Sequence, residues 1–237
     1  MIAVFVNMAT VLCGSLLGIL LRNRLKPSIQ EALMKALGLC TVLIALSSAI
    51  KTEALLCVIL CMVIGTAIGE ALRLDDGIEH AGDFIKAKLF KGESAESRFT
   101  EGFVSACILF CIGSMTIVGS LEAGINHNYS IIYAKSTMDF VSSMAFGAAM
   151  GFGVTCSALF VLVFQGALTL LSGLLAPVLS TAVVTEMSAV GGVILIGMAI
   201  NILGLGKERI RVANMLPAIF LPIAYFPFVQ LLKGLFS

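Results

Sequence analysis

Long runs without charged residues or His dominate the sequence and alternate with short polar segments. Residues 1–21 contain no Asp, Glu, Lys, Arg or His, and this run ends at Arg22 and Arg24. A helix rises about 1.5 Å per residue, so about 20 apolar residues cross the hydrocarbon layer of a bilayer. The run has no basic leading segment and no small-residue cleavage site, so we interpret it as a first membrane span rather than a signal peptide.

Similar apolar runs along the rest of the chain predict seven further spans. They are expected at about 33–50, 54–72, 99–119, 137–152, 155–175, 187–206 and 212–232. The fifth and sixth share a single uncharged run, 140–185, which as one helix would be about 69 Å long and too long for one span. Gly147, Gly151 and Gly153 mark the predicted break between them.

The predicted fold class is therefore all-α, a polytopic membrane protein with about eight transmembrane helices and some interruptions. We expect one transmembrane domain over residues 1–237, a polar loop at 121–135, and a kinked last span that carries Pro217, Pro222 and Pro227. Residues 73–98 place apolar side chains at helical spacing, which predicts an amphipathic connector. That connector could lie on the inner membrane surface or stand free as a solvated helix.

The distribution of Lys and Arg agrees with eight spans. On this count, 12 of the 15 basic residues lie in the first, third and seventh loops and their flanks, and Lys51, Lys135 and Lys233 lie opposite. Because cytoplasmic loops are rich in Lys and Arg, both termini are expected outside. If the fifth and sixth spans were one helix, the basic cluster at 207–211 would fall on the other face.

Composition narrows the class of protein further. Hydrophobic residues make up 59% of the chain and charged residues 12%, about half the charged share of a typical soluble domain. The net charge of +1 offers no basic surplus for a phosphate backbone, so we expect no nucleic-acid partner. The expected partners are the lipid bilayer and a small solute or ion.

A short pattern of small residues occurs twice. Residues 14–22 and 65–73 both read G-[ST]-x-x-G-x-x-L-R. Glycines four residues apart let helices approach closely in lipid, so helix packing is the simplest interpretation, and an internal duplication is the alternative. Such packing could join copies into a homo-oligomer or act within one subunit.

Three acidic residues lie within or beside predicted spans, where a charge is expensive and suggests a function. They are Asp139 at the start of the fifth span, Glu186 at the start of the seventh, and Glu70 at the end of the third. The first two are followed by small hydroxyl residues and by glycines that could open a cavity or break a helix. The hydroxyl residues are Ser142, Ser143 and Ser188.

Helix capping is the structural alternative for Asp139 and Glu186. Ser136-x-x-Asp139 fits a loose capping box, and an acid in the first turn complements the helix dipole. Against capping alone, four uncharged polar residues also lie in predicted spans: Asn7, Gln165, Asn201 and Asn214. Each could make one interhelical hydrogen bond, but together with two acids they suggest a polar pathway. Desolvation there would let a carboxyl group exchange a proton near neutral pH.

Metal and enzyme chemistry have little support in the sequence. The seven cysteines all lie in predicted spans, and although Cys57/Cys61 and Cys107/Cys111 are one helical turn apart, zinc-type spacings are missing. We find no H-E-x-x-H, Walker or G-x-S-x-G motif, and no Ser, Cys or His arrangement that fits a triad. We therefore expect no catalytic residues, no metal and no cofactor, and a protein that is not an enzyme.

Residues of both halves resemble the YdfK/YqgA-like family of uncharacterised bacterial inner-membrane proteins. They are Lys135, 136–139, 142–153, Gln165, Gly166, Glu186, Met187, Gly191, Gly192 and 211–217, with Asn7 and 14–18 near the N-terminus. The resemblance implies a multi-pass protein of the bacterial cytoplasmic membrane. It implies no substrate and no mechanism, because the family is a domain of unknown function.

These observations lead to one functional hypothesis and one alternative. The first is a secondary transporter or channel for a small solute or ion, with Asp139 and Glu186 binding a cation or proton and Gln165, Asn201 and Asn214 lining the route. The alternative is a membrane scaffold or assembly factor whose polar residues only hold helices together.

Overall fold

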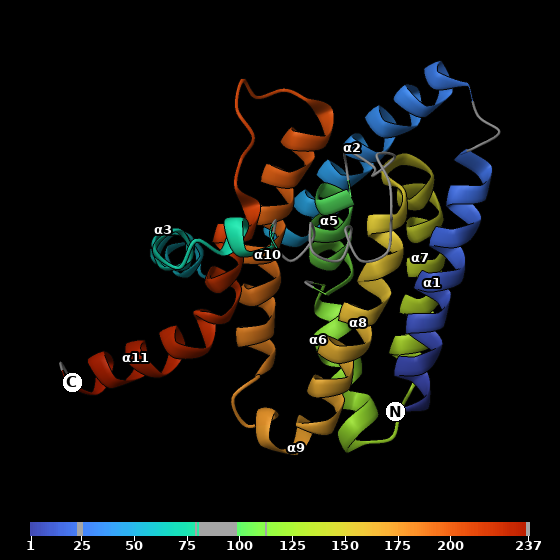
Figure 1. Ribbon diagram of the computed structural model, residues 1–237. Coiled ribbons are helices and arrows are strands. Elements are labelled where there is room, and N and C mark those ends of the chain that lie inside the picture. Colours follow the sequence, from blue (N-terminus) through green and yellow to red (C-terminus); the bar gives the residue numbers. More distant parts are fainter. Residues whose placement is uncertain (23–25, 79, 81–98, 112, 236–237) are drawn as a thin grey trace.

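A computed structural model describes residues 1–22, 26–78, 80, 99–111 and 113–235 of the chain (Figure 1). In these ranges the regular elements are helices, as the all-α membrane fold predicts. Most of the expected amphipathic connector at 73–98 lies outside the described residues. The elements are α1 (Ile2–Arg22), α2 (Pro27–Ala49), α3 (Leu55–Ala71), α5 (Phe99–Cys111), α6 (Ser114–Ile125), α7 (Ser130–Met150), α8 (Phe152–Leu170), α9 (Ser172–Leu175), α10 (Thr181–Leu203), the 3₁₀ helix η1 (Val212–Phe220) and α11 (Pro222–Leu235).

The number of helices fit to cross a bilayer is lower than the eight that we expected. Within the described residues, five are long and apolar enough, or six if α5 and α6 are counted as one span bent by 56°. Two predicted spans differ for physical reasons. The apolar helix α3 has 17 residues and is about 26 Å long, shorter than the roughly 30 Å hydrocarbon layer. The helix α7 carries Lys135 and Asp139 within its length, which lowers its hydropathy.

The break predicted in the long uncharged run is confirmed. α7 ends at Met150 and α8 begins at Phe152, with only Gly151 between them. Gly151 has φ 78°, a backbone conformation that residues with a Cβ rarely adopt. One glycine therefore allows two apolar helices to follow each other without forming one overlong span.

The polar loop expected at 121–135 is wrong in its extent. α6 continues to Ile125 and α7 begins at Ser130, so only residues 126–129 connect the two helices. Asn126, His127 and Asn128 lie in this connection, whereas Glu122, Ser130 and Lys135 lie on helices. One of them, Lys135, belongs to the interior of the protein.

The last predicted span is interrupted, as its prolines indicate. Residues Val212–Phe220 form a 3₁₀ helix that contains Pro217, and α11 follows from Pro222. Proline has no N–H to donate and clashes with the preceding turn of an α-helix, so a continuous α-helix is disfavoured here. η1 packs chiefly against α3.

Two groups of helices occupy opposite edges of the molecule. α1 packs along α7, and α8 contacts both α1 and α5. α3 lies at the other edge and is seen end-on in Figure 1, where α8 and α10 run vertically, so α3 crosses the direction of those helices. α10 packs against α2 and η1 and thereby connects the two groups.

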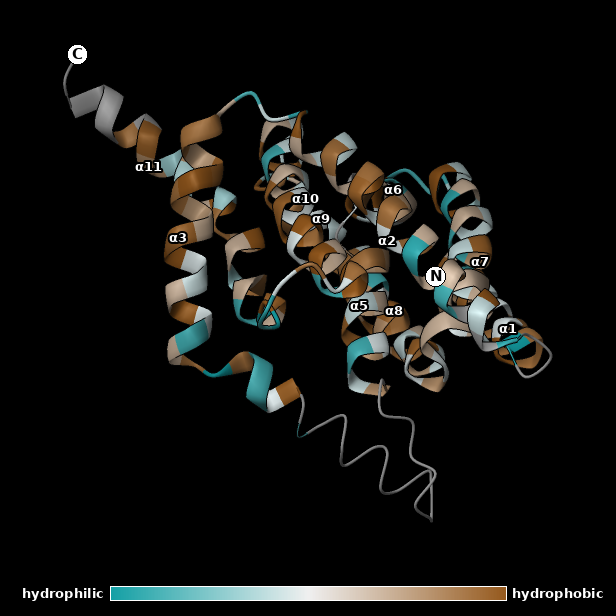
Figure 2. Ribbon diagram, turned by 90° about the horizontal axis from the view of Figure 1, so that it is seen from above, coloured by the Kyte–Doolittle hydropathy of each residue, from teal (hydrophilic) through white to brown (hydrophobic). Residues whose placement is uncertain are grey.

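The outer faces of the helices are apolar. Leu20, Leu43, Val63 and Leu159 are each more than half exposed, and Figure 2 shows hydrophobic residues on every labelled helix. A soluble protein would not expose so many large apolar side chains, whereas lipid covers them without penalty. The arrangement is that of a membrane protein.

The repeated small-residue pattern packs helices, as its simplest interpretation predicts. A Cβ at Gly18 would collide with the Met144 carbonyl of α7, and one at Gly65 would collide with Ala218 of η1. The two copies of the pattern therefore serve two different interfaces within one chain. These glycines are accounted for without a second subunit.

Candidate functional site

A buried ion pair lies in the middle of α7. Lys135 and Asp139 are one helical turn apart, and their residues are only 5% and 6% exposed. The Lys135 ammonium donates a hydrogen bond to Oδ2 of the Asp139 carboxylate. Asp139 lies well inside the helix that starts at Ser130, so the capping-box alternative is wrong. The Ser136 hydroxyl donates instead to the Ile132 carbonyl, at 2.8 Å.

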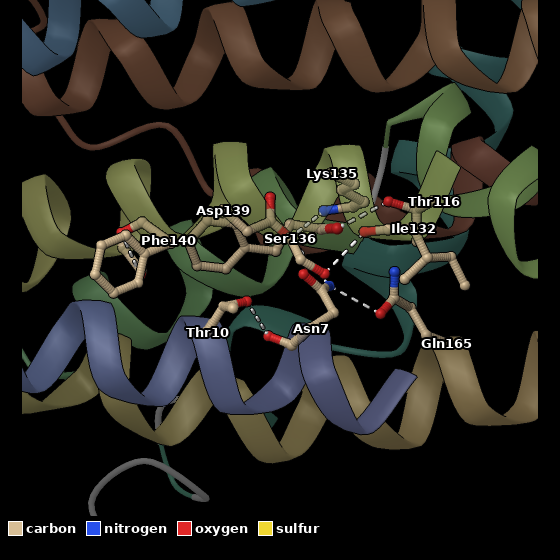
Figure 3. Close-up of polar contacts among 11 residues, drawn as sticks. Asn7, Thr10, Thr116, Ile132, Lys135, Ser136, Asp139, Phe140 and Gln165 are labelled. Carbon is tan, nitrogen blue, oxygen red and sulfur yellow. Dashed lines mark hydrogen bonds and ion pairs between the residues drawn. The ribbon is translucent and has the colours of Figure 1, made fainter. Parts of the chain in front are cut away.

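Amide side chains of two other helices complete this group. Asn7 of α1 donates through Nδ2 to Asp139 Oδ2 at 3.1 Å and to Gln165 Oε1 of α8 at 2.9 Å. Figure 3 shows these side chains meeting between their helices. We refer to Asn7, Lys135, Asp139 and Gln165 as the polar cluster. Both amide residues are fully buried, at 0% exposure.

The polar cluster does not satisfy all of its own hydrogen-bonding atoms. Asn7 Oδ1 and Gln165 Nε2 are buried without a partner in the described structure. A buried polar atom without a hydrogen bond costs about 1–3 kcal/mol, and most native structures avoid it. One unused acceptor and one unused donor therefore remain beside a buried pair of opposite charges.

The break between α5 and α6 borders the polar cluster. The Lys135 ammonium lies 5.9 Å from the ring centroid of Phe110, in the last turn of α5. The Thr116 hydroxyl of α6 donates to the Phe110 carbonyl at 2.9 Å, across the bend between the two helices. The aromatic face stabilises the cation by a cation–π interaction, so the bend contributes to holding Lys135 inside the protein.

Glu186 occupies a separate position and has a visible structural role. It lies within α10 and is 1% exposed. Its Oε1 accepts the backbone N–H groups of Glu53 and Ala54 at 2.8 and 3.1 Å, and its Oε2 accepts the Thr52 hydroxyl at 2.6 Å. Glu186 therefore holds the turn that leads into α3, whereas its own helix is capped by Ser180.

α10 is not broken at the glycines that follow its acid, and α7 is broken only at Gly151. α7 continues past Gly147, and α10 continues past Gly191 and Gly192. Gly192 lies against the backbone of α2, where a Cβ would collide with Ala49. Gly147 and Gly192 thus allow close packing between helices. No hydrogen bond joins Asp139 to Glu186 in the part of the chain that the structure describes.

Asn201 and Asn214 hold a third region, distant in sequence from the polar cluster. Asn201 donates to the Ile210 carbonyl at 2.8 Å and accepts the Ile210 N–H at 2.9 Å, which closes the turn after α10. Asn214 accepts the Asp75 N–H at 2.7 Å and donates to Glu70 at 2.5 Å. Both amide side chains thus hydrogen-bond to neighbouring segments of the chain. Neither makes a hydrogen bond with Gln165 among the described contacts.

The three serine candidates are also distributed. Ser143 is buried on α7 and donates to the Phe140 carbonyl at 3.0 Å, facing α1 at Gly14. Ser142 is half-buried. The buried Ser188 hydroxyl has no partner in the described structure. None of the three donates or accepts a hydrogen bond with the polar cluster among the described contacts.

Lys135 and Asn7 are the two members of the polar cluster that are not among the site residues predicted from the sequence. We counted Lys135 as a loop residue opposite the basic face. The signal was the four-residue spacing between Lys135 and Asp139, which places opposite charges on the same face of a helix. Asn7 was noted as polar but was not assigned to the site.

Comparisons with known proteins agree with the resemblance expected from the sequence. The family model described as "Protein of unknown function (DUF554)" matches residues 2–226. The "Uncharacterized membrane protein YdfK" of Bacillus subtilis is 24% identical over 216 residues, which cover 91% of each chain. The "Uncharacterized protein YqgA" of Escherichia coli is 31% identical over 221 residues, 92% of each chain. No solved structure matches. The chain is a membrane protein and belongs to the DUF554 family.

Proposed function

We propose that the protein is a secondary transporter or channel for a small solute or ion, with the polar cluster as its binding site. The observation that carries this proposal is the buried Lys135–Asp139 pair together with two unused amide atoms. Ionisable residues within membrane helices are expensive and are typical of substrate and ion pathways. A purely structural contact would have no need of unused atoms.

The geometry favours Asp139 over Glu186 as the group that responds to the transported species. Both hydrogen bonds to Asp139 end on Oδ2, which leaves Oδ1 for a ligand. Glu186 already accepts three donors from residues 52–54. We therefore assign coupling to Asp139 and the positioning of α3 to Glu186.

The same proposal includes an orientation. The end of α1, the start of α2 and the turn between α10 and η1 lie at one end of the bundle, and the N-terminus lies at the other (Figure 1). Arg22 ends α1, Lys26 precedes α2, and the turn contains Lys207, Arg209 and Arg211. By the positive-inside rule, the basic end faces the cytoplasm. A bacterial cytoplasmic membrane with both termini outside is then the proposed location, and a reporter enzyme active only outside, fused to the C-terminus, tests it.

The experiment on function uses purified protein in liposomes. Flux or transport current is measured for protons, sodium, potassium and a panel of small polar solutes, in comparison with protein-free liposomes. We expect Asp139→Asn to abolish the flux and Glu186→Gln to retain it per folded molecule. Glu31→Gln is the control, because Glu31 forms an exposed pair with Lys35 on α2.

A scaffold or assembly factor is the second candidate, and one observation favours it. Glu186, Asn201 and Asn214 all use their side chains to bind other parts of the same chain. Absence of any flux above protein-free liposomes would support the scaffold. Wild-type flux in Asp139→Asn would remove the carboxylate from the transport mechanism.

A further inference from the structure

The polar cluster has unused hydrogen-bonding capacity of both signs. On the acceptor side are Asp139 Oδ1, which neither hydrogen bond to the carboxylate reaches, and the unpartnered Asn7 Oδ1. On the donor side are the Gln165 amide nitrogen, also unpartnered, and the Lys135 ammonium, which has three N–H groups and one hydrogen bond to Asp139. The free capacity thus consists of two acceptors and two donors.

This combination discriminates between classes of ligand. A cation alone would bind the two acceptors. It would lie beside the positively charged Lys135 and leave the Gln165 donor without a partner. A lone anion would satisfy the donors and leave Asp139 and Asn7 without partners. Since an unpaired buried charge is strongly destabilising, either ion would disturb a pair that is neutral as a whole.

We propose that the polar cluster binds a small zwitterionic amino acid. Its ammonium group binds Asp139 and the Asn7 oxygen, and its carboxylate binds Lys135 and the Gln165 amide nitrogen. On binding, Asp139 and Lys135 each exchange their partner in the ion pair for the opposite charge of the ligand. The net charge of the site stays zero with or without the ligand. This inference rests on the proposed function, because it names the solute that the site would carry.

The surroundings offer no partner for a charged side chain of the ligand. Ala3, Val4 and Ile132 are all 0% exposed and form a separate small apolar cluster around this end of α1 and α7. These aliphatic side chains border the polar cluster and carry no charge that could pair with a charged side chain of the ligand. Alanine, glycine and serine fit this description, and amino acids with charged side chains do not.

The test is direct binding to the purified full-length protein in detergent near pH 7. Titration calorimetry and the thermal midpoint of unfolding are measured with L-alanine, with propionate and with ethylamine. Propionate retains the carboxylate without the ammonium, and ethylamine retains the ammonium without the carboxylate. We expect L-alanine to bind and to raise the midpoint, with affinity lower by about 10- to 100-fold for the charged contact that each analogue lacks.

Variants connect this binding to the polar cluster. The double variant Lys135→Met/Asp139→Asn removes both charges together and is expected to lose L-alanine binding. Gln165→Met keeps the ion pair and is expected to weaken binding by about tenfold. Glu31→Gln/Lys35→Met is the matched control, because it removes an exposed pair of the same spacing and should bind L-alanine as the wild type does.

The outcomes separate this inference from the proposed function. If L-alanine, propionate and ethylamine bind equally, or if only one of the single-charge analogues binds, the zwitterion assignment is wrong. If none binds while liposomes carry ion flux that depends on Asp139, transport stands and the amino acid assignment fails. If L-alanine binds selectively and no flux is found, the recognition holds and the transport proposal fails.

Discussion

Removal of the charges at Lys135 and Asp139, one at a time and then together, tests whether the pair is a coupled unit. Both side chains are less than a tenth exposed, at 7% and 9%. Lys135→Met leaves the Asp139 carboxylate with the Asn7 amide as its remaining hydrogen-bond donor. Asp139→Asn leaves the buried ammonium beside the Phe110 ring and a neutral amide.

The expected magnitudes follow from this burial. Loss of one partner of a buried ion pair costs about 3–5 kcal/mol, whereas replacement of both by neutral groups is often close to neutral. At about 2–4 °C per kcal/mol for a chain of this size, each single variant should lower the unfolding midpoint by about 6–20 °C. The double variant should lie within about 3 °C of the wild type.

The buried cysteines provide the assay. Cys57, Cys61, Cys107 and Cys111 are free thiols inside the protein, so a fluorogenic maleimide reports their exposure as detergent-solubilised protein is heated. The control is Glu31→Gln/Lys35→Met, which removes an exposed pair of the same spacing on α2. For this pair, the decreases in unfolding midpoint of the two single variants should add up to that of the double variant. If the decreases in unfolding midpoint of Lys135→Met and Asp139→Asn also add in the double variant, the two residues act independently. That result would refute the coupled ion pair.

Three further predictions concern residues that hold the fold. Gly18→Leu should destabilise the protein by at least about 2 kcal/mol because its side chain would meet the α7 backbone, whereas Gly173→Leu, with open space around it, should not; thermal unfolding compares them. Glu186→Ala should cost about 1–3 kcal/mol and speed amide hydrogen exchange at Glu53 and Ala54, and unchanged exchange there would contradict its role in holding the turn before α3. Asn201→Ala should make the turn at 204–211 more sensitive to trypsin, and equal cleavage rates would show that its two hydrogen bonds do not hold that turn.

The helical membrane fold could be predicted because apolar run length is a local property. Uncharged runs of about 20 residues have few stable structures other than helices in lipid. Gly147, Gly151 and Gly153 marked the region of the break within the longest run, and the structure places it at Gly151. The number of spans was harder to predict. Whether α3 crosses the bilayer depends on the helices it packs against, and the direction of α3 across α10 follows from contacts with η1 far along the chain.

The candidate site was predicted in part. Asp139 and Gln165 were chosen for the cost of polar groups in lipid, and the structure brings them together through Asn7. Glu186 was chosen for the same reason, but its partners lie at residues 52–54, and no local pattern could reveal them. Polarity at membrane depth therefore identifies residues that need a partner without identifying the partner.

The hydrogen bonds of Asn7 set an order of events during synthesis. Its acceptors lie 132 and 158 residues further along the chain. At a translation rate of about 5–20 residues per second, roughly 7–26 s pass between the emergence of Asn7 and that of Asp139. α1 is therefore locked in place late, and a nascent chain stalled before α7 would leave α1 in the lipid without its main packing partner.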